Sequence, residues 1–279
     1  MQPATNRLAL LSEADLDFLV RAVTETRTDY DHIKNIVRGK TDLLQVMLDD
    51  ERVFLRLVNN PDALLQVSPY LLFTVLLRRA QRDLRSRRFT MEVSTQGTLP
   101  VFDADAAATL LEDEAVRDYL AAMLEGFTRI ERHTVQVPGA RGPRRVTYSD
   151  FAVEEMEALV ELADESQRFP LYRRLGDLCL FLTGMFADHL ATRAREAATR
   201  GARVRRREPQ DIEEYEERGR TYYRRAAEAE PAAALGLADL LARLADQFTL
   251  ARKPLFVIAQ TYIPLQRHRL FPAGPLSGA

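Results

Sequence analysis

The sequence predicts a predominantly α-helical fold, a multi-helix globular bundle with a small β-hairpin or three-stranded element near residues 89–100 and 134–148. Three observations lead to this prediction. Apolar residues recur with the 3.6-residue period of a helix along most of the chain. Residues that favour helix starts and helix ends separate these periodic segments. The helical period is lost near the two β segments, where alternation and Pro-Gly turns favour strands.

The N-terminal part of the chain is expected to form helices. Ser12 is a typical N-cap residue, and an apolar stripe from Leu16 to Val37 predicts one helix over 12–39. A second helical segment is expected to begin at Thr41 and to break near Asp49 and Asp50.

Ser68 and Pro69 begin a strongly apolar predicted helix, PYLLFTVLLRRAQRDL. After it, FTMEV alternates as a strand does, and HTVQVPGARGPRRVTY reads as a hairpin. We expect these segments to form one small sheet. The helical block between them, 103–132, is expected to stand as a lobe on this β neck.

The most apolar stretch is LGDLCLFLTGMFADHL, residues 175–190. Its uninterrupted small or apolar run, 178–187, is far shorter than the roughly 20 residues that cross a membrane. We therefore expect a long buried helix from Pro170 to about Gly201. One of its sides carries small residues that permit close helix packing: Gly176, Cys179, Thr183 and Ala187.

Two more helical segments are expected, over 211–230 and over 234–263, and Pro254 should kink or break the second. We expect a single helical domain over 1–272, with two lobes, 1–148 and 149–272, as the alternative. The tail 273–279 is expected to be disordered.

Composition limits the classes of function. The chain has 279 residues, a formal net charge of -2 and one cysteine. This charge gives no global attraction to nucleic acid or to an anionic membrane. The single cysteine and the N-terminus, which lacks a secretory apolar run, predict a protein of the cytoplasm.

The stretch YRRLGDLCLFLTGMFADHL resembles helical bacterial proteins in which LGD precedes an apolar LFL-x-G-x-F run. The resemblance implies a helical fold and no particular activity. Nucleotide-binding, hydrolase, zinc-protease, CxxC and di-iron motifs are absent from the sequence. We therefore predict no catalytic residue, no metal site and no cofactor.

Cations at apolar-face positions are the strongest deviation from the helical pattern. On a continuous first helix, Arg27, Lys34 and Arg38 lie close to the line through Leu16. Three explanations stay open: side chains that reach solvent at the edge of the core, buried ion pairs, or a cleft that receives an anion. The candidate anion site comprises Arg27, Tyr30, Lys34, Arg38 and Asp177.

Asp177 itself is expected to be held by the helix N-terminal dipole and by a cation from Arg27, Lys34, Arg173 or Arg174. Of the 39 lysines and arginines, only three are lysines, a bias that coding composition can produce. The densest basic cluster, Arg200 to Arg207, precedes the acidic start of the next helix, so the two blocks can pair.

Three classes of function follow from these residues. A helical protein-interaction or scaffold protein, with a protein partner or a homo-oligomer, explains the missing catalytic motifs most simply. An enzyme or sensor that binds a small anionic ligand between helices is the first alternative. A nucleic-acid binder that uses Arg200 to Arg207 is the second.

Overall fold

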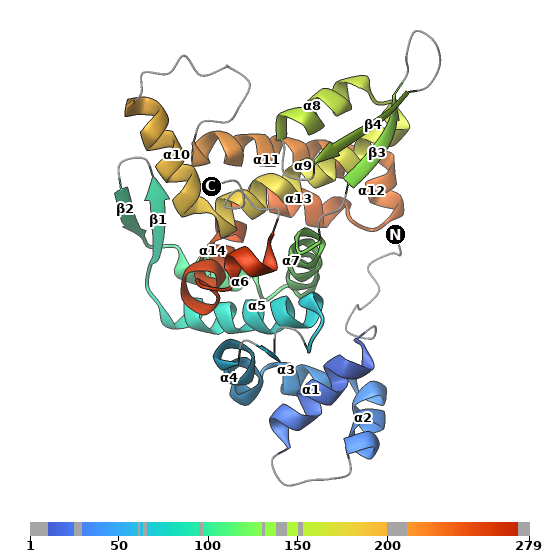
Figure 1. Cartoon of the computed structure of the whole chain (residues 1–279), viewed down its shortest axis with the longest axis vertical. Helices are drawn as coiled ribbons and strands as arrows, with labels where there is room; N and C mark the ends of the chain where they lie inside the picture. The colour runs from blue at the N-terminus through green and yellow to red at the C-terminus, as the bar shows by residue number, and fades with distance from the viewer. Residues whose placement is uncertain are drawn as a thin grey trace.

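The computed structural model confirms the predominantly helical fold with small β elements (Figure 1). It describes residues 11–24, 30–60, 62–63, 66–94, 97–129, 132–137, 144–149, 153–199 and 211–272. The helices are α1 (Glu13–Val23), α2 (Tyr30–Gly39), α3 (Thr41–Leu48), α4 (Glu51–Asn59), α5 (Pro69–Ser86), α6 (Ala104–Leu110), α7 (Glu114–Phe127), α8 (Val153–Leu162), α9 (Glu165–Met185), α10 (Ala187–Thr199), α11 (Ile212–Glu228), α12 (Glu230–Ala234), α13 (Ala238–Asp246), α14 (Phe248–Val257), the π-helix η3 (Ile258–Tyr262) and α15 (Arg267–Leu270). The strands are β1 (Thr90–Ser94), β2 (Gly97–Val101), β3 (Arg132–Val137) and β4 (Arg144–Ser149).

The first helix is shorter than the sequence predicts. Ser12 caps α1 as expected, in a reciprocal capping box with Asp15. The helix ends at Val23, because Thr24 is extended and its hydroxyl donates back to the carbonyl of Val20. The helical phase of α1 therefore does not continue into α2. The prediction that Lys34 shares the line of Leu16 on one helix was wrong for this reason.

The predicted break near Asp50 is confirmed, since its carboxylate caps α4 by accepting from the amide of Arg52. Ser68 caps α5 in the same way, and Pro69 occupies its first turn. Buried Asp15 also accepts a 2.7 Å hydrogen bond from the amide of Ser68. This bond joins the start of α1 to the start of α5.

The two β segments form two separate antiparallel pairs, β1 with β2 and β3 with β4. The expected single sheet was wrong. A second strand, β2, follows FTMEV directly and pairs with it, with Met91 opposite Pro100. Within each hairpin the two strands pair their backbone hydrogen-bonding groups with each other, and the hairpins do not join into one sheet.

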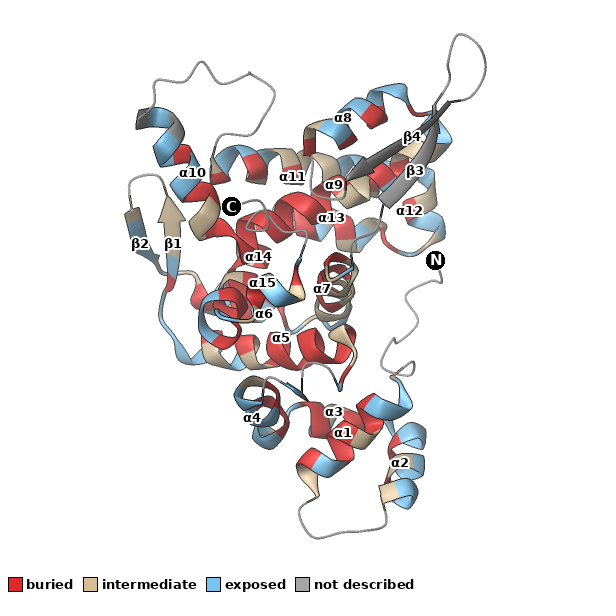
Figure 2. Cartoon of the chain, viewed as in Figure 1, coloured by how far each residue is buried: buried red, intermediate tan, exposed pale blue. Residues whose placement is uncertain are grey.

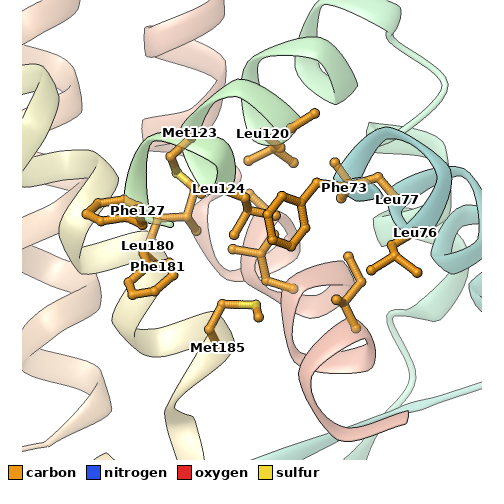
Figure 3. Packing of buried hydrophobic residues seen from close by; sticks show 14 of the residues in the cluster. Phe73, Leu76, Leu77, Leu120, Met123, Leu124, Phe127, Leu180, Phe181 and Met185 are labelled. Carbon is orange, nitrogen blue, oxygen red and sulfur yellow. The ribbon is translucent and has the colours of Figure 1, made fainter. Parts of the chain in front are cut away.

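The helical block between the hairpins packs into the core, so the prediction of a lobe on a β neck was wrong. Helices α6 and α7 pack against α5, and α6 also contacts α14. Figure 3 shows side chains of α5, α7 and α9 converging, among them Phe73, Phe127 and Phe181. The rings of Phe127 and Phe181 stack 4.3 Å apart. Buried apolar residues form one cluster from Leu16 to Phe271.

The central helix α9 is confirmed as a buried helix, but its ends differ from the prediction. It begins at Glu165, so Pro170 lies inside it, and it stops at Met185. The following α10 is a separate helix. Arg267 donates a 2.7 Å hydrogen bond to the carbonyl of Met185 and pairs with Asp188, so one guanidinium joins the end of α9 to the start of α10.

Small residues on α9 allow its close packing against α11 and α14, as expected. A β-carbon on Gly176 would lie 2.6 Å from the ring of Tyr223 on α11. A β-carbon on Gly219 of α11 would lie 2.9 Å from the Cys179 β-carbon. Cys179 is fully buried, which confirms its packing role.

The C-terminal helices end at other residues than the sequence predicts. The break falls at Gly236, whose φ of 66° glycine adopts readily, and again at Gln247. Pro254 stays within α14, which passes directly into the π-helix η3. Predicted residues 211–230 are confirmed as α11, with Asp211 as its N-cap.

None of the helices in the described ranges combines the length and the apolar character that a bilayer crossing needs. The division into one domain or two lobes stays a prediction. The tail 273–279 lies outside the described residues.

Candidate functional site

Two of the predicted anion-binding residues, Lys34 and Arg38, lie on α2 and pair with carboxylates. The Lys34 ammonium lies 2.7 Å from a carboxylate oxygen of Asp17 on α1 and 2.8 Å from one of Asp31. Arg38 pairs with Glu13 of α1. Hydrogen bonds to Asp17 and Asp31 raise the pKa of Lys34 above its ordinary value. These ion pairs connect α2 to α1.

Of the other residues of the predicted anion site, Tyr30 shares α2 with Lys34, whereas Asp177 lies on another helix. Tyr30 begins α2, and the guanidinium of Arg21 lies 5.1 Å from the centre of its ring. Arg27 lies outside the described residues. Asp177 belongs to α9, and Figure 1 shows α2 and α9 in opposite halves of the molecule along its long axis. The described members of the set therefore divide between α2, with Tyr30, Lys34 and Arg38, and α9, with Asp177.

Asp177 is buried and accepts hydrogen bonds from two tyrosines. The hydroxyls of Tyr119 on α7 and Tyr223 on α11 donate to the same oxygen, Oδ1, at 2.6 and 2.9 Å. Burial and the neighbouring Asp177 raise the pKa of both tyrosines well above the ordinary value. Both phenols therefore stay protonated and act as donors to the carboxyl group.

The sequence offered several candidate cations for Asp177, and the structure separates them. Lys34 is wrong as a partner, because it pairs with α1. Arg173 lies near enough for its charge to lower the pKa of Tyr119, against the larger effect of burial. Arg174 instead covers the ring of Phe127 at 3.7 Å. The two tyrosines carry no local sequence signal, since they belong to distant helices.

The basic cluster Arg200 to Arg207 lies outside the described residues. Within the described ranges, no three His, Cys, Asp or Glu side chains gather closely enough to hold a metal ion.

A buried ionic cluster lies beneath the first hairpin. Lys253 of α14 is only 1% exposed, and its ammonium lies 3.0 Å from Asp103 and also pairs with Glu92 of β1. The hydroxyl of Thr90 donates to the other oxygen of Asp103 at 2.5 Å. The inner side of β1 is therefore fixed to α14 by charge-assisted contacts.

The same cluster continues to α11. Arg252, also buried, pairs with Glu216 of α11 and lies 3.3 Å from Glu92. Glu216 accepts a 2.9 Å hydrogen bond from Thr249 and lies 3.5 Å from Arg220. Cations and carboxylates alternate through the cluster, so each buried charge has an opposite neighbour. The hairpin is thereby joined to two core helices.

The other side of the hairpin is apolar and exposed. We call Phe89, Met91, Pro100 and Phe102 the aromatic hairpin face. Phe89 is 45% exposed, Met91 40% and Phe102 81%. The rings of Phe89 and Phe102 meet edge to face, 6.2 Å apart, and Met91 lies opposite exposed Pro100. These four residues lie on one side of the hairpin in two neighbouring cross-strand positions.

Exposed apolar side chains are concentrated here. Of the nine large hydrophobic residues that are exposed in the described part of the chain, three lie on the aromatic hairpin face: Phe89, Met91 and Phe102. A fourth, Leu99, belongs to the same hairpin but lies opposite Glu92, on its other side. Figure 2 shows β1 and β2 mostly in tan and pale blue, beside α10 at the edge of the molecule. Val93, farther along β1, packs against the core and limits the face at that end. Clustered exposed apolar residues of this kind mark binding surfaces.

Sequence reasoning found β1 but missed this face. The alternation in FTMEV puts Phe89 and Met91 on one side and Thr90 and Glu92 on the other. The pattern therefore predicts two different sides, and only the fold shows that the polar side is the buried one. The usual rule of apolar side inward is reversed, because Lys253 and Arg252 lie beneath the hairpin.

Comparisons with known proteins gave no match: no family model, no curated protein and no solved structure is similar to this chain.

Proposed function

We propose that this protein is a protein-interaction protein that binds another protein through the aromatic hairpin face. The observation that carries the proposal is the reversed polarity of the hairpin, with charged residues buried and aromatic residues exposed. Exposing these apolar side chains is unfavourable in the free protein, and a bound partner removes them from water.

Rigidity supports the same proposal. Glu92 in the middle of β1 and Asp103 just after β2 both pair with Lys253, so each strand is tied to α14 without a partner. A preorganised surface loses little conformational entropy on binding. Aromatic residues and methionine are also enriched in protein interfaces.

The alternatives have less support. The carboxylates of Asp17 and Asp31 already compensate Lys34, which weakens the case for a free anion there. A cytoplasmic location is part of our proposal, and the free, buried Cys179 agrees with a reducing compartment.

Site-specific photo-crosslinking in the native cells tests the proposal. A photoreactive amino acid replaces Met91 in the full chain, and the matched control carries it at Leu162, another exposed apolar residue. We expect a discrete adduct with one different protein from position 91 and none from position 162.

The specificity of that adduct is checked with Phe102→Ser. Phe102 is mostly exposed, so the variant should fold normally, and we expect it to lose the adduct. An adduct that survives Phe102→Ser, an equal adduct from position 162, or an adduct only with a second copy would contradict the proposal.

A further inference from the structure

The hairpin formed by β1 and β2 has one free edge. Figure 1 shows β2 at the margin of the molecule, and β1 lies between it and α10, which contacts β1. Within the described residues, β2 pairs with β1 alone. Thr98, Leu99 and Pro100 of β2 are all exposed. The outer edge of β2 therefore faces solvent.

The register shows which backbone groups of β2 point to this edge. In an antiparallel pair, residues whose N–H and C=O groups face the neighbouring strand alternate with residues whose groups face away from it. The hydroxyl of Ser94 donates to the carbonyl of Gly97 at 3.1 Å, so the backbone of Gly97 faces β1. Every second residue from Gly97 onward also faces β1, whereas Thr98 and Pro100 face outward.

Of these two outward residues, Pro100 cannot donate a hydrogen bond. Its nitrogen carries no hydrogen, and its ring occupies the place where an N–H would point. It stands opposite Met91, at a position where the pairing with β1 needs no donor. A strand that approached β2 from outside would find a donor only at Thr98 and would meet the ring of Pro100 beside it. Strand pairing along this edge is therefore weakened.

The surroundings make an unprotected edge prone to self-association. An exposed strand edge in an apolar hairpin is a template for pairing with another chain, and proline on the edge is one feature by which proteins prevent this pairing. Here the hairpin exposes apolar side chains on both sides, among them Met91, Leu99 and Phe102. In the described part of the chain, no other backbone group bonds to the outward amide of Thr98.

We infer that Pro100 keeps copies of this protein apart by preventing the free edge of β2 from pairing with a strand of another copy. The inference goes beyond the proposed function, because it concerns the backbone at the edge and not the side chains of the aromatic hairpin face. That face is then left free for a different partner.

Sedimentation velocity over a series of concentrations tests the inference with the full-length protein. Pro100→Val and Pro100→Thr both supply the missing N–H, one with an apolar side chain and one with a polar side chain. A third variant adds Thr98→Pro to Pro100→Val and so removes the other outward donor. Pro264→Val is the matched control, because Pro264 is exposed but lies outside the strands. Circular dichroism checks that each variant is folded.

We expect the wild type and Pro264→Val to sediment as one species at every concentration, and Pro100→Val and Pro100→Thr to shift to larger species. Self-association of these two variants should be stronger than that of the wild type by about tenfold or more, because the recovered donor adds hydrogen bonds between copies. Hydrogen exchange of the amides at positions 98 and 100 should slow as their concentration increases. Adding Thr98→Pro should reverse the association.

Four other outcomes would overturn the inference. Sedimentation of both position-100 variants like the wild type would show that the edge does not pair even without Pro100. Association of Pro100→Val but not Pro100→Thr, or association that survives Thr98→Pro, would assign it to the valine side chain. Slower exchange of the wild-type Thr98 amide at high concentration would show that Pro100 does not prevent pairing. Loss of folding in both variants would assign Pro100 to the fold. The photo-crosslinking experiment tests the proposed function separately.

Discussion

The Tyr223 hydroxyl of α11 donates a 2.9 Å hydrogen bond to the Asp177 carboxyl group of α9, and neither residue is more than 6% exposed. Tyr119 of α7 donates to the same oxygen. This one carboxyl group therefore holds three helices together through two phenols.

Replacing Asp177 with alanine leaves both hydroxyls without their acceptor. We expect the free energy of unfolding to fall by about 2 to 6 kcal/mol, since each of the two buried, unsatisfied donors costs about 1 to 3 kcal/mol. Urea melts measure the loss. Tyr119→Phe with Asp177→Ala should lose less than the sum of the single changes, because the groups share one network. A loss below about 1 kcal/mol for Asp177→Ala would show that water replaces the carboxyl group.

Cys179 should react slowly with thiol reagents in the folded protein and quickly after unfolding. Its sulfur is fully buried, and burial raises the pKa of the thiol far above its ordinary value, so almost no thiolate forms. Labelling followed by mass spectrometry, with and without urea, measures both rates. Rapid labelling under native conditions would place the thiol in an opening between α9 and α11 that solvent reaches.

Two helical glycines should respond in opposite directions to alanine. At Gly219 the new β-carbon would clash with the ring of Phe248 and crowd Cys179, so we expect a loss of about 1 to 3 kcal/mol. At Gly126 in α7 the new carbon meets only Arg174, at 3.6 Å. Gly126→Ala should therefore stabilise by roughly 0.5 to 1 kcal/mol. Thermal melts of the two variants compare them directly, and equal effects would refute the close packing of α11 on α9.

Lys253→Met should destabilise by about 3 to 5 kcal/mol, because it leaves Glu92 and Asp103 beside each other without their shared cation. The exposed Lys40→Met is the control and should stay within about 0.5 kcal/mol of the wild type. Hydrogen exchange should also speed up in β1 and β2 of the Lys253 variant. Unchanged exchange there would mean that the ionic cluster does not hold the hairpin.

Stability should decrease as pH falls below about 6.5, in part through His189. Burial and the charge of Arg193 lower the pKa of His189 from its ordinary 6.5 in the folded protein. The unfolded chain therefore takes up the proton first, and the stability present above pH 6.5 is lost as pH falls through the folded pKa. Denaturant melts from pH 7.5 to 5 should show a shallower slope for His189→Gln than for the exposed His32→Gln. Identical slopes would contradict this.

The titration of Asp188 does not add to the change in stability between pH 7.5 and 5. Burial raises the pKa of Asp188, but the hydrogen bond and charge of Arg267 outweigh it, so the pKa lies below the ordinary 3.8. The contribution of this ion pair is lost only at lower pH.

The sequence predicted those elements whose signals are local. Ser12 and Ser68 begin helices where expected, a helix begins at the expected position near 211, and the strand alternation located β1. The missed breaks at Thr24 and Phe186 have weaker local signals. Thr24 ends α1 through its own hydroxyl, and the end of α9 is completed by Arg267 from far along the chain.

The candidate site was harder to predict because it depends on what lies beneath a strand. No local pattern shows that Lys253 and Glu92 meet, since α14 and β1 are far apart in the sequence. The predicted anion site assumed a continuous first helix, but α1 ends before Thr24, so this assumption was wrong. The periodicity of apolar residues is enough to predict the fold class, whereas predicting the site requires contacts between residues far apart in the sequence.

The contacts of Phe271 set an order for folding during synthesis. Its ring lies 5.7 Å from that of Phe73 on α5 and 4.9 Å from that of Phe181 on α9. Both helices leave the ribosome before residue 271 does, so this part of the core cannot close until residue 271 has emerged as well. A nascent chain that stalls before residue 271 displays two uncovered aromatic surfaces, which chaperones bind and which promote aggregation.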